Sequence, residues 1–366
     1  MRWSFTVFRV AGTDVKIHVT FFLLLAWIGF AAWHEGGPAA AADSLIFIVL
    51  LFACVVLHEF GHILVARRYG IATPEVTLLP IGGVASLKSL PTKPLQELAV
   101  AIAGPLVNVA IALLIILALG EVRPEAIEHL DDQHVSLLVR LAAANLFLAI
   151  FNLIPAFPMD GGRVLHALLS LRYGPARATQ IAANVGQALA FVFGFLGLFG
   201  NPLLIFVAIF VYVAAAGEAQ VSALQESAKG LKVGDATETK IATLSANATL
   251  GQAVDALIAN AQHEFPVVDA FNKPMGLFTR EDILAALKAN ERDKPIVDLL
   301  RAPPATAFAT SPLAPTLEKI FGESASALCV TDADGVLVGL LTRQNLAEVM
   351  MIRTARPDWR FGAKSA

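Results

Sequence analysis

Long apolar runs fill the first part of the chain and end near residue 225. A helix needs about 20 apolar residues to cross the hydrocarbon core of a bilayer, and several runs reach or approach that length. The Gly-Asn-Pro turn at 200–202 separates the last two runs. The pattern predicts a six-span helical bundle, with spans at Val19–Trp33, Ser44–Ala66, Leu95–Leu119, Ser136–Phe157, Ile181–Phe199 and Pro202–Ala216.

Between the second and third runs the pattern is extended rather than helical. Alternating apolar residues lead through Pro80 to the pair Gly82-Gly83 and then to further apolar residues. This predicts a small β-hairpin at the membrane surface over Thr73–Leu87. Two interpretations stay open: the hairpin holds an unwound substrate by strand addition, or it plugs the access path.

From about Lys229 onward the pattern is that of a globular domain, and it repeats. The segment Gly276–Ile283 matches Gly339–Leu346. Each of the two longer repeats that contain these segments predicts a helix, a strand, a turn, a second strand and a second helix. Duplication of this kind indicates two similar α/β modules packed together. We therefore assign two domains, residues 1–225 and 226–366, the second with repeats at about 229–290 and 292–353.

Composition agrees with a membrane protein, because 56% of the residues are apolar and only 16% are charged. Soluble domains carry roughly 25% charged residues. A net charge of −3 without a basic cluster excludes a nucleic-acid partner. The two cysteines, Cys54 and Cys329, exclude a disulfide framework. The first apolar run is interpreted as a retained span, with a cleaved secretory signal as the alternative.

Basic residues in the short loops predict the orientation. Cytoplasmic loops carry an excess of Lys and Arg. The loops of the opposite side hold only Arg123, among acidic residues. Both termini and the second domain are therefore expected to be cytoplasmic, on the side that holds Arg2, Arg9, Lys16, Arg67, Arg68, Lys88, Lys93, Arg163, Arg172 and Arg177.

Ionisable residues interrupt the second apolar run at His58-Glu59-Phe60-Gly61-His62. Residues four apart share a helix face, so both histidines can bind one metal ion, and Glu59 can act as general base. A solvated amphipathic helix fits poorly, because this helix is apolar all round and ionisable side chains inside a membrane are costly. With Arg67 as the cytoplasmic boundary, His62 lies about 8 Å and His58 about 13 Å deeper.

Catalytic zinc usually takes three protein ligands, which leaves one to find. His166 is predicted in a short interfacial helix, Val164–Leu171. The other histidines lie near span ends, in polar loops or in the second domain: His18, His34, His129, His134 and His263. Asp160 is the better candidate, because it follows the fourth span at about the depth of the first two ligands. Nearby prolines and paired glycines are expected to break the helix and let the backbone present this carboxylate.

At these residues the chain resembles the site-2 protease family, over nearly the whole first domain. The resemblance rests on three motifs in the family's order: His58 to His62, Gly104-Pro105-Leu106-Val107-Asn108, and Asn152 through Gly162. It implies one zinc ion held by His58, His62 and Asp160. It also implies Glu59 as the base and Asn152 as a residue that helps to stabilise the oxyanion.

Other residues near these motifs are given supporting or packing roles. Gly104, Pro105 and Asn108 are expected to support the site, since small residues permit close helix packing. Met159 stands where many relatives have another apolar residue. Cys54, one turn before His58, is interpreted as a small buried apolar residue rather than a ligand.

The duplicated region resembles a pair of CBS domains, over Lys229 to about Arg353. The signature is the repeated Gly-Leu-x-Thr-Arg-x-Asp/Asn. By this resemblance an adenine nucleotide binds between the repeats, with contacts from Thr279 and Asp282 and, in the second repeat, Thr342 and Asn345. Asn345 replaces an acid there. Such pairs also serve for dimerisation alone, so a homodimer through this module is the other expectation.

Taken together, these features predict an intramembrane zinc metalloprotease that cuts transmembrane segments of other proteins and is modulated by its CBS pair. The alternative is a transporter or channel regulated by that pair, in which the histidines and Asp160 line a metal path. Glu59 between the histidines favours the protease.

Overall fold

The computed structural model describes residues 3–10, 12–80, 82–86, 93–119, 136–289, 294–322, 326–356, 358–359 and 361. The predicted acidic loop with His129 and His134 lies outside these residues, as does the end of the hairpin at Leu87. The chain divides into two compact units, Met1–Gln220 and Val221–Ala366.

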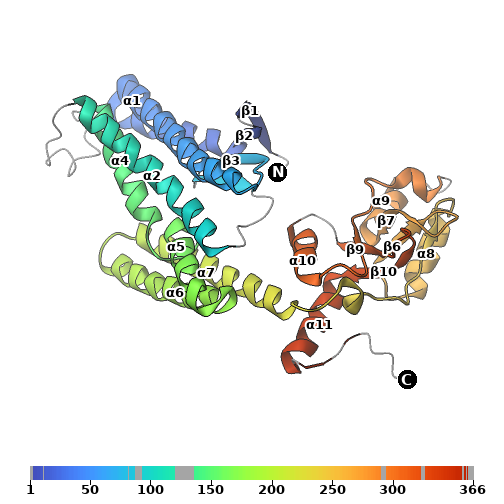
Figure 1. Ribbon diagram of the computed structural model, residues 1–366. Helices are drawn as coiled ribbons and strands as arrows, with labels where there is room; N and C mark the ends of the chain where they lie inside the picture. The colour runs from blue at the N-terminus through green and yellow to red at the C-terminus, as the bar shows by residue number, and fades with distance from the viewer. Residues whose placement is uncertain are drawn as a thin grey trace. The chain divides into compact units, whose positions relative to one another are not determined.

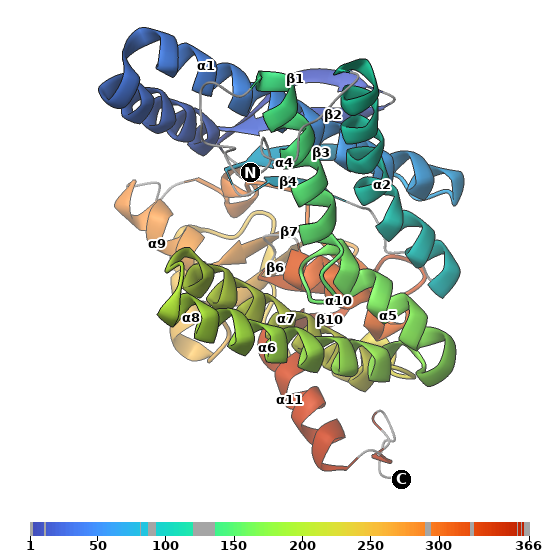
Figure 2. The same ribbon diagram turned by 90° about the vertical axis from the view of Figure 1, so that its left-hand side faces the viewer.

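Helix α1 (Val19–Arg68) contains two helical halves that fold back on each other (Figure 2). Gly37 leaves the helical conformation, with φ 74° and ψ −165°, and Pro38 follows it. A positive φ costs glycine little, and proline cannot continue the hydrogen bonds of a preceding helix. The rings of Phe21 and Phe52, one from each half, pack edge to face 4.6 Å apart. One kinked helix therefore contains the first two predicted spans.

The rest of the first unit is also mainly helical (Figure 1). Among the described residues, four helices are long and apolar enough to cross a membrane: α1, α2, α6 and α7. Large apolar side chains on these helices point outward, such as Phe199 at 79% exposed and Leu117 at 76%, as expected of a surface that faces lipid. The helices after α1 are α2 (Pro94–Leu119), α4 (Leu137–Asn152), α5 (Asp160–Tyr173), α6 (Pro175–Phe199) and α7 (Leu203–Ser227).

The fourth predicted span differs from the helix observed. Helix α4 has 16 residues and ends at Asn152 rather than Phe157, and the following helix begins at Asp160 rather than Val164. The prolines of the intervening turn break the helix as expected. Gly161 and Gly162 do not, because both lie inside α5. A Cβ at Gly162 would fall 2.6 Å from the Phe157 nitrogen, so the glycines let α5 pack against the turn.

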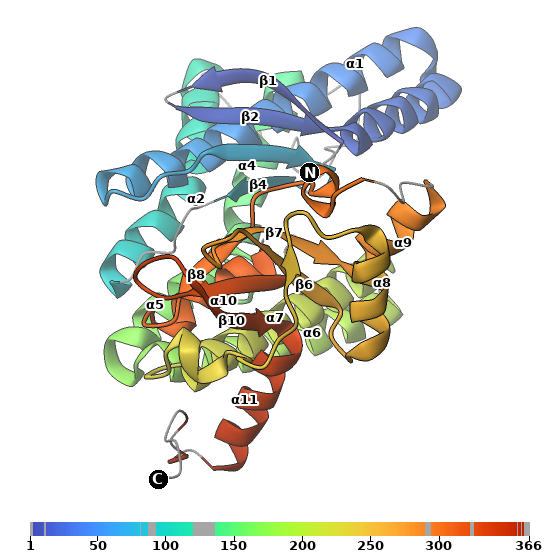
Figure 3. The ribbon, with the colours of Figure 1, turned by 90° about the vertical axis from the view of Figure 1, so that its right-hand side faces the viewer.

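A four-stranded sheet in the order β1-β2-β3-β4 packs beside α1 (Figure 3). The predicted hairpin is confirmed as β3 (Glu75–Leu79) antiparallel to β4 (Gly82–Ser86). The sequence pattern gave no sign of β1 (Ser4–Val10) or β2 (Thr13–His18), which pairs in parallel with β3. Strand β2 ends at the residue before α1 begins, so this strand leads directly into the N-terminus of the helix.

The second unit contains the two predicted repeats. Each has a three-stranded sheet, β5-β6-β7 or β10-β9-β8, with two parallel strands and one antiparallel strand. The first repeat has β5 (Leu244–Ser245), α8 (Leu250–Ala259), β6 (Glu264–Val268), β7 (Pro274–Thr279) and α9 (Arg280–Lys288). The second has β8 (Thr306–Phe308), α10 (Leu313–Gly322), β9 (Ala327–Thr331), β10 (Leu337–Thr342) and α11 (Arg343–Ala355).

Equivalent positions fill the cores of the two repeats. Phe265 pairs with Phe278 across the first sheet, and Leu328 pairs with Leu341 across the second. All four side chains are at most 1% exposed. Burial of large apolar side chains at matching positions is what a duplicated sequence predicts.

Candidate metal centre and active site

His58 and His62 lie one turn apart on the second half of α1 and face the same way. Their Nε2 atoms are 3.1 Å apart. His58 is only 6% exposed, and the helix around it is apolar. The spacing of four residues is what brings the two imidazoles together on one helix face.

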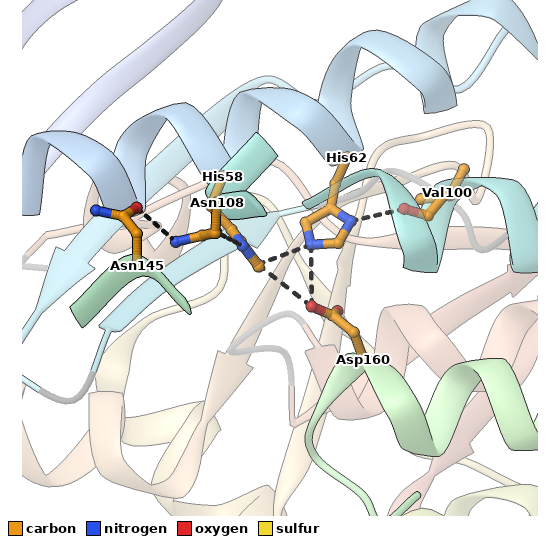
Figure 4. A network of polar contacts seen from close by, with 6 residues as sticks. All are labelled: His58, His62, Val100, Asn108, Asn145 and Asp160. Atoms are coloured by element: carbon orange, nitrogen blue, oxygen red, sulfur yellow. Dashed lines mark hydrogen bonds and ion pairs between the residues drawn. The ribbon is translucent and has the colours of Figure 1, made fainter. Parts of the chain in front are cut away.

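Asp160 reaches the same point from another helix. It is the first residue of α5, and its Oδ2 lies 3.2 Å from the His58 Nε2 and 3.3 Å from the His62 Nε2. The three ligand atoms therefore form a nearly equilateral triangle (Figure 4). Among the described residues, these are the only three His, Cys, Asp or Glu side chains grouped as metal ligands, so Cys54 is not part of the group.

The other nitrogen of each imidazole faces a hydrogen-bond acceptor (Figure 4). The His58 Nδ1 lies 2.5 Å from the Asn108 Oδ1, and the His62 Nδ1 lies 2.7 Å from the Val100 carbonyl oxygen. A neutral imidazole that donates from Nδ1 leaves Nε2 with a free lone pair. Both lone pairs then point toward the Asp160 carboxylate.

The donor set fits zinc. Nitrogen and oxygen ligands about 2.0–2.1 Å from a tetrahedral zinc ion lie about 3.3 Å from one another. The observed separations are 3.1, 3.2 and 3.3 Å. Two nitrogen lone pairs and a carboxylate oxygen at this distance repel one another unless a cation lies among them. Acceptors at the outer nitrogens also match the usual surroundings of zinc-binding histidines.

Gly104 of α2 makes room for both imidazoles. A Cβ there would lie 2.6 Å from the His58 Nε2 and in contact with the His62 ring. Gly61 of α1 makes room for the backbone of α2, because a Cβ there would fall 2.8 Å from the Ala103 oxygen. Small residues on the facing surfaces of α1 and α2 thus allow the helices to approach closely.

The ligand triangle opens into a cavity of about 450 Å³. Glu59 and Asn152 both line it, and so do Gly82 and Gly83 of β4. A Cβ at Gly83 would lie 2.9 Å from the Glu59 Oε1, so the strand passes directly beside this carboxylate. The residues predicted to act as base and as oxyanion donor therefore share one cavity with the three candidate ligand residues.

The CBS residues predicted to bind a nucleotide form helix caps in both repeats. Thr279 and Asp282 make reciprocal hydrogen bonds at the start of α9, and Asp282 also pairs with Arg301 at 3.1 Å. Thr342 and Asn345 make the same arrangement at the start of α11. A Thr followed three residues later by an acid or amide is a capping box, so the motif has a structural function besides any ligand contact.

Thr342 and Asn345 also line a cavity of about 600 Å³ in the second unit. Other polar residues line its walls, including Lys240 and Glu264. Burial raises the pKa of the Glu264 carboxyl, and the His263 imidazole opposes that shift. The cavity therefore combines hydrogen-bonding groups with two cationic side chains, Lys240 and Arg343.

Sequence reasoning missed two polar side chains near the metal centre. Asn145 of α4 is fully buried and hydrogen-bonds to Asn108 at 3.0 Å. His166, predicted only to lie in a short interfacial helix, hydrogen-bonds to the Glu97 carboxylate at 2.9 Å and so joins α5 to α2. A single amide in an apolar helix gives no periodic signal, and only its depth in the predicted span could have drawn attention to Asn145.

Family models match both parts of the chain. Residues 46–124 and 124–193 match the model of Peptidase family M50, and residues 233–289 match that of the CBS domain. A zinc metalloprotease of Methanocaldococcus jannaschii is 35% identical over 274 residues, which cover 74% of this chain and 76% of the relative. Rip3 of Mycobacterium tuberculosis is 29% identical over 99% of this chain and 96% of its own length.

A solved structure is similar as well. The site-2 protease from Methanocaldococcus jannaschii is 38% identical, covers 59% of this chain and 95% of that chain, and has a TM-score of 0.45.

The chain belongs to Peptidase family M50, the site-2 proteases. It is a membrane-embedded, zinc-dependent metalloprotease that also carries a CBS domain. The family match decides between the two classes that the sequence pattern left open, in favour of the protease over a transporter or channel.

Proposed function

We propose that His58, His62 and Asp160 hold one catalytic zinc ion inside the membrane domain, and that this site hydrolyses peptide bonds in or near transmembrane segments of other proteins. The observation that carries the proposal is the triangle of ligand atoms, 3.1 to 3.3 Å on a side. A cation among these three buried atoms would offset the repulsion between their lone pairs.

The protein supplies the proton transfer and the charge stabilisation. When bound, zinc supplies a Lewis acid that polarises the scissile carbonyl and the attacking water. Glu59 lines the same cavity and is next to a ligand in sequence, which suits a base that takes the proton from that water. The Asn152 side chain is a neutral amide on the cavity wall, and its N–H can donate to the carbonyl oxygen as negative charge develops.

Glu59→Gln tests this assignment. The amide is nearly isosteric and cannot take a proton, so we expect full zinc content and at least a 100-fold loss of cleavage. Retained cleavage would contradict the role of Glu59. His58→Ala should lose zinc and cleavage together, and a variant that keeps stoichiometric zinc would contradict the ligand set. The inactive Glu59→Gln protein can also trap membrane substrates for identification.

We propose further that β4 binds the unwound substrate by strand addition. Among the described strands β4 pairs only with β3, so its outer edge is open there. Gly83 on this strand lies against Glu59, and a peptide aligned along the open edge would pass the proposed base. Main-chain hydrogen bonds of this kind hold a substrate without regard to its side chains.

Single prolines at Val84 and Ala85 of β4 test strand addition. The N–H groups of adjacent strand residues point to opposite edges, so one proline removes a hydrogen bond to β3 and the other removes a donor from the open edge. We expect the variant that loses the donor at the open edge to keep zinc and to lose cleavage at least tenfold. If both variants cleave at the normal rate, β4 is not the substrate-binding edge, and the hairpin as a plug becomes the better interpretation.

For the topology, we propose six crossings with cytoplasmic termini and domains at residues 1–225 and 226–366. The fold of α1 at Gly37 supports two crossings within that helix, and α4 would provide a short one. Single cysteines placed near both termini and at residue 201 test the orientation in cells. An impermeant thiol reagent applied from outside should not label the cysteines near the termini. Labelling of those cysteines would mean that the proposed orientation is reversed.

We propose that the CBS pair binds an adenine nucleotide at the cavity lined by Thr342 and Asn345, and that it can join two copies of the chain. The amide of Asn345 and the ammonium of Lys240 supply a donor and a cation for ribose and phosphate. Calorimetry of the full chain with AMP and ATP should show binding that Lys240→Met weakens about tenfold. No heat with either nucleotide would leave dimerisation, measured by light scattering, as the function of the module.

A further inference from the structure

Asn145 of α4 lies at the far end of a hydrogen-bonded chain that begins at His58 (Figure 4). Asn108 donates from Nδ2 to the Asn145 Oδ1 at 3.0 Å, and Asn145 donates from Nδ2 to the Leu141 carbonyl oxygen at 2.8 Å. Both asparagines are 0% exposed. Burial of polar amides in an apolar bundle is costly unless every group is hydrogen-bonded, and this chain provides the bonds.

The direction of every bond in the chain is fixed at its end. The Leu141 carbonyl oxygen can only accept, so Asn145 must turn its NH2 toward it and its Oδ1 toward Asn108. Asn108 must then turn its NH2 toward Asn145 and its Oδ1 toward His58. His58 is left to donate from Nδ1, which frees the Nε2 lone pair that faces Asp160.

The second histidine needs no such chain. The His62 Nδ1 faces the Val100 carbonyl oxygen directly, and a backbone carbonyl cannot turn round to become a donor. A side-chain amide can do so, because its two ends have almost the same shape. Asn108 alone would therefore leave the tautomer of His58 undetermined.

We infer that Asn145 is a positioning residue that fixes the metal-binding tautomer of His58 through Asn108. The inference rests on the proposed zinc site and deepens it. Asn145 touches neither the ligand atoms nor the cavity; it acts by holding the Asn108 amide in the one orientation that accepts from the imidazole. Its contribution should therefore appear in metal affinity before it appears in any property of the substrate.

Asn145→Leu in the full chain, purified in detergent, is the first test. The leucine is similar in size and cannot accept from Asn108. Outer partners of metal-binding histidines typically change metal affinity by roughly 10–100-fold, and we expect a loss of that size in Zn²⁺ affinity by chelator competition. The visible absorption of the Co²⁺-substituted protein should also change, because the ligand field at His58 changes.

Asn108→Asp separates positioning from packing. A carboxylate accepts with either oxygen, so the substituted side chain can accept from His58 in any orientation and does not depend on Asn145 to orient it. We expect Asn145→Leu to weaken Zn²⁺ binding by less than about twofold in the Asn108→Asp background. An equal loss in both backgrounds would mean that Asn145 only packs, and an unchanged affinity in the normal background would overturn the inference outright.

A matched control removes a buried polar group elsewhere in the same unit. Thr179→Val deletes a hydrogen bond to the Pro175 carbonyl oxygen, 3.0 Å long, on α6. It should leave Zn²⁺ affinity and the Co²⁺ spectrum unchanged. If the unaltered chain binds no Zn²⁺, or if His58→Ala does not reduce binding, the proposed metal site itself fails. If the unaltered chain binds Zn²⁺ through His58 and Asn145→Leu has no effect, the inference about Asn145 fails alone.

Discussion

Gly83 of β4 lies against Glu59 of α1, so close that a Cβ on the glycine would fall 2.7 Å from the Glu59 Cγ. The contact joins a strand of the surface sheet to the residue proposed as the catalytic base. Strand and base are therefore held at one fixed spacing, and any side chain at Gly83 must move one of them.

Gly83→Ala should reduce cleavage without loss of zinc. Displacement of the Glu59 carboxylate by a fraction of an ångström to about 1 Å can cost about 10–100-fold in rate, because proton transfer depends on position. Zinc content should stay at one ion per chain, since Glu59 is not a proposed ligand. Steady-state cleavage of a transmembrane peptide, together with metal analysis, measures both quantities.

Gly217→Ala is the matched control for that variant. A Cβ at Gly217 meets nothing within 4 Å, and the residue lies in the helix α7. The same chemical change in open space should leave both activity and zinc unchanged. If Gly83→Ala cleaves as fast as Gly217→Ala, the contact with Glu59 does not control the base.

Gly104→Ala should have the opposite signature, with zinc lost together with activity. The added methyl would lie 2.6 Å from the His58 Nε2, so the imidazoles cannot keep their positions unless α2 moves away. We expect zinc content below about a tenth of an ion per chain, since the new atom occupies space needed for the ligands. Gly194→Ala is the control, because its Cβ would meet Ala208 at an ordinary 3.6 Å. Full zinc content in Gly104→Ala would show that the site has more room than the structure indicates.

The sequence predicted the two histidines because their spacing is a helical repeat and their setting is apolar. The break between the first two runs predicted two separate spans, which the structure joins in one helix kinked at Gly37. Alternation around Gly82-Gly83 predicted the hairpin. Asp160 was a weaker prediction, since one carboxylate after a proline-rich turn has no period, and the family resemblance supplied its role. For the histidines, the span break and the hairpin, the signal was local in the chain.

Features that depend on distant contacts were not predicted. Strands β1 and β2 form because β2 pairs with β3, about 60 residues later in the chain. Asn145 meets Asn108 only after α2 and α4 have packed, so its role has no sequence spacing to mark it. The paired glycines Gly161 and Gly162 were predicted to break the helix, but tertiary packing against the preceding turn placed them inside α5.

Cys329 should be almost unreactive in the folded protein. It lies on β9 at 1% exposed, and burial raises the pKa of its thiol from 9.0 to about 12. At pH 8 the thiolate fraction is then about one in ten thousand, and the thiolate is the reactive form. In a Cys54→Ala background, maleimide labelling at pH 8 should proceed only as fast as the CBS unit unfolds. Fast labelling without denaturant would contradict burial of this thiol.

The same shift has a defined sign for stability. The folded thiol keeps its proton up to about pH 12, whereas the unfolded thiol loses it above about pH 9. The contribution of Cys329 to the free energy of unfolding is therefore fully present below pH 9 and falls as the pH rises toward 12. Urea unfolding of the protein at pH 8 and pH 10.5, with Cys329→Ala as the control, should show a larger alkaline loss in the chain that retains the thiol.

Arg140 and Asp43 form an ion pair at 2.8 Å between α4 and α1. Removing the carboxylate should cost more stability than removing the guanidinium. The Arg140 side chain is 7% exposed and packs over the Phe47 ring, whereas Asp43 is 35% exposed. Asp43→Asn leaves a buried guanidinium without its counter-charge and should cost about 3 kcal/mol, the lower end of the range for buried pairs. Arg140→Met leaves a carboxylate that water can still reach, so its cost should be nearer to about 1 kcal/mol.

The double variant decides whether charge or packing causes the loss. Asp43→Asn combined with Arg140→Met has no unpaired charge, so it should be close to Arg140→Met alone and more stable than Asp43→Asn. Unfolding in mixed micelles, followed by circular dichroism, measures the four proteins of this cycle. Glu226→Gln is the control: its exposed pair with Lys229 on and after α7 should contribute less than about 0.5 kcal/mol. A double variant as unstable as Asp43→Asn would show that the lost carboxylate matters for packing rather than for charge.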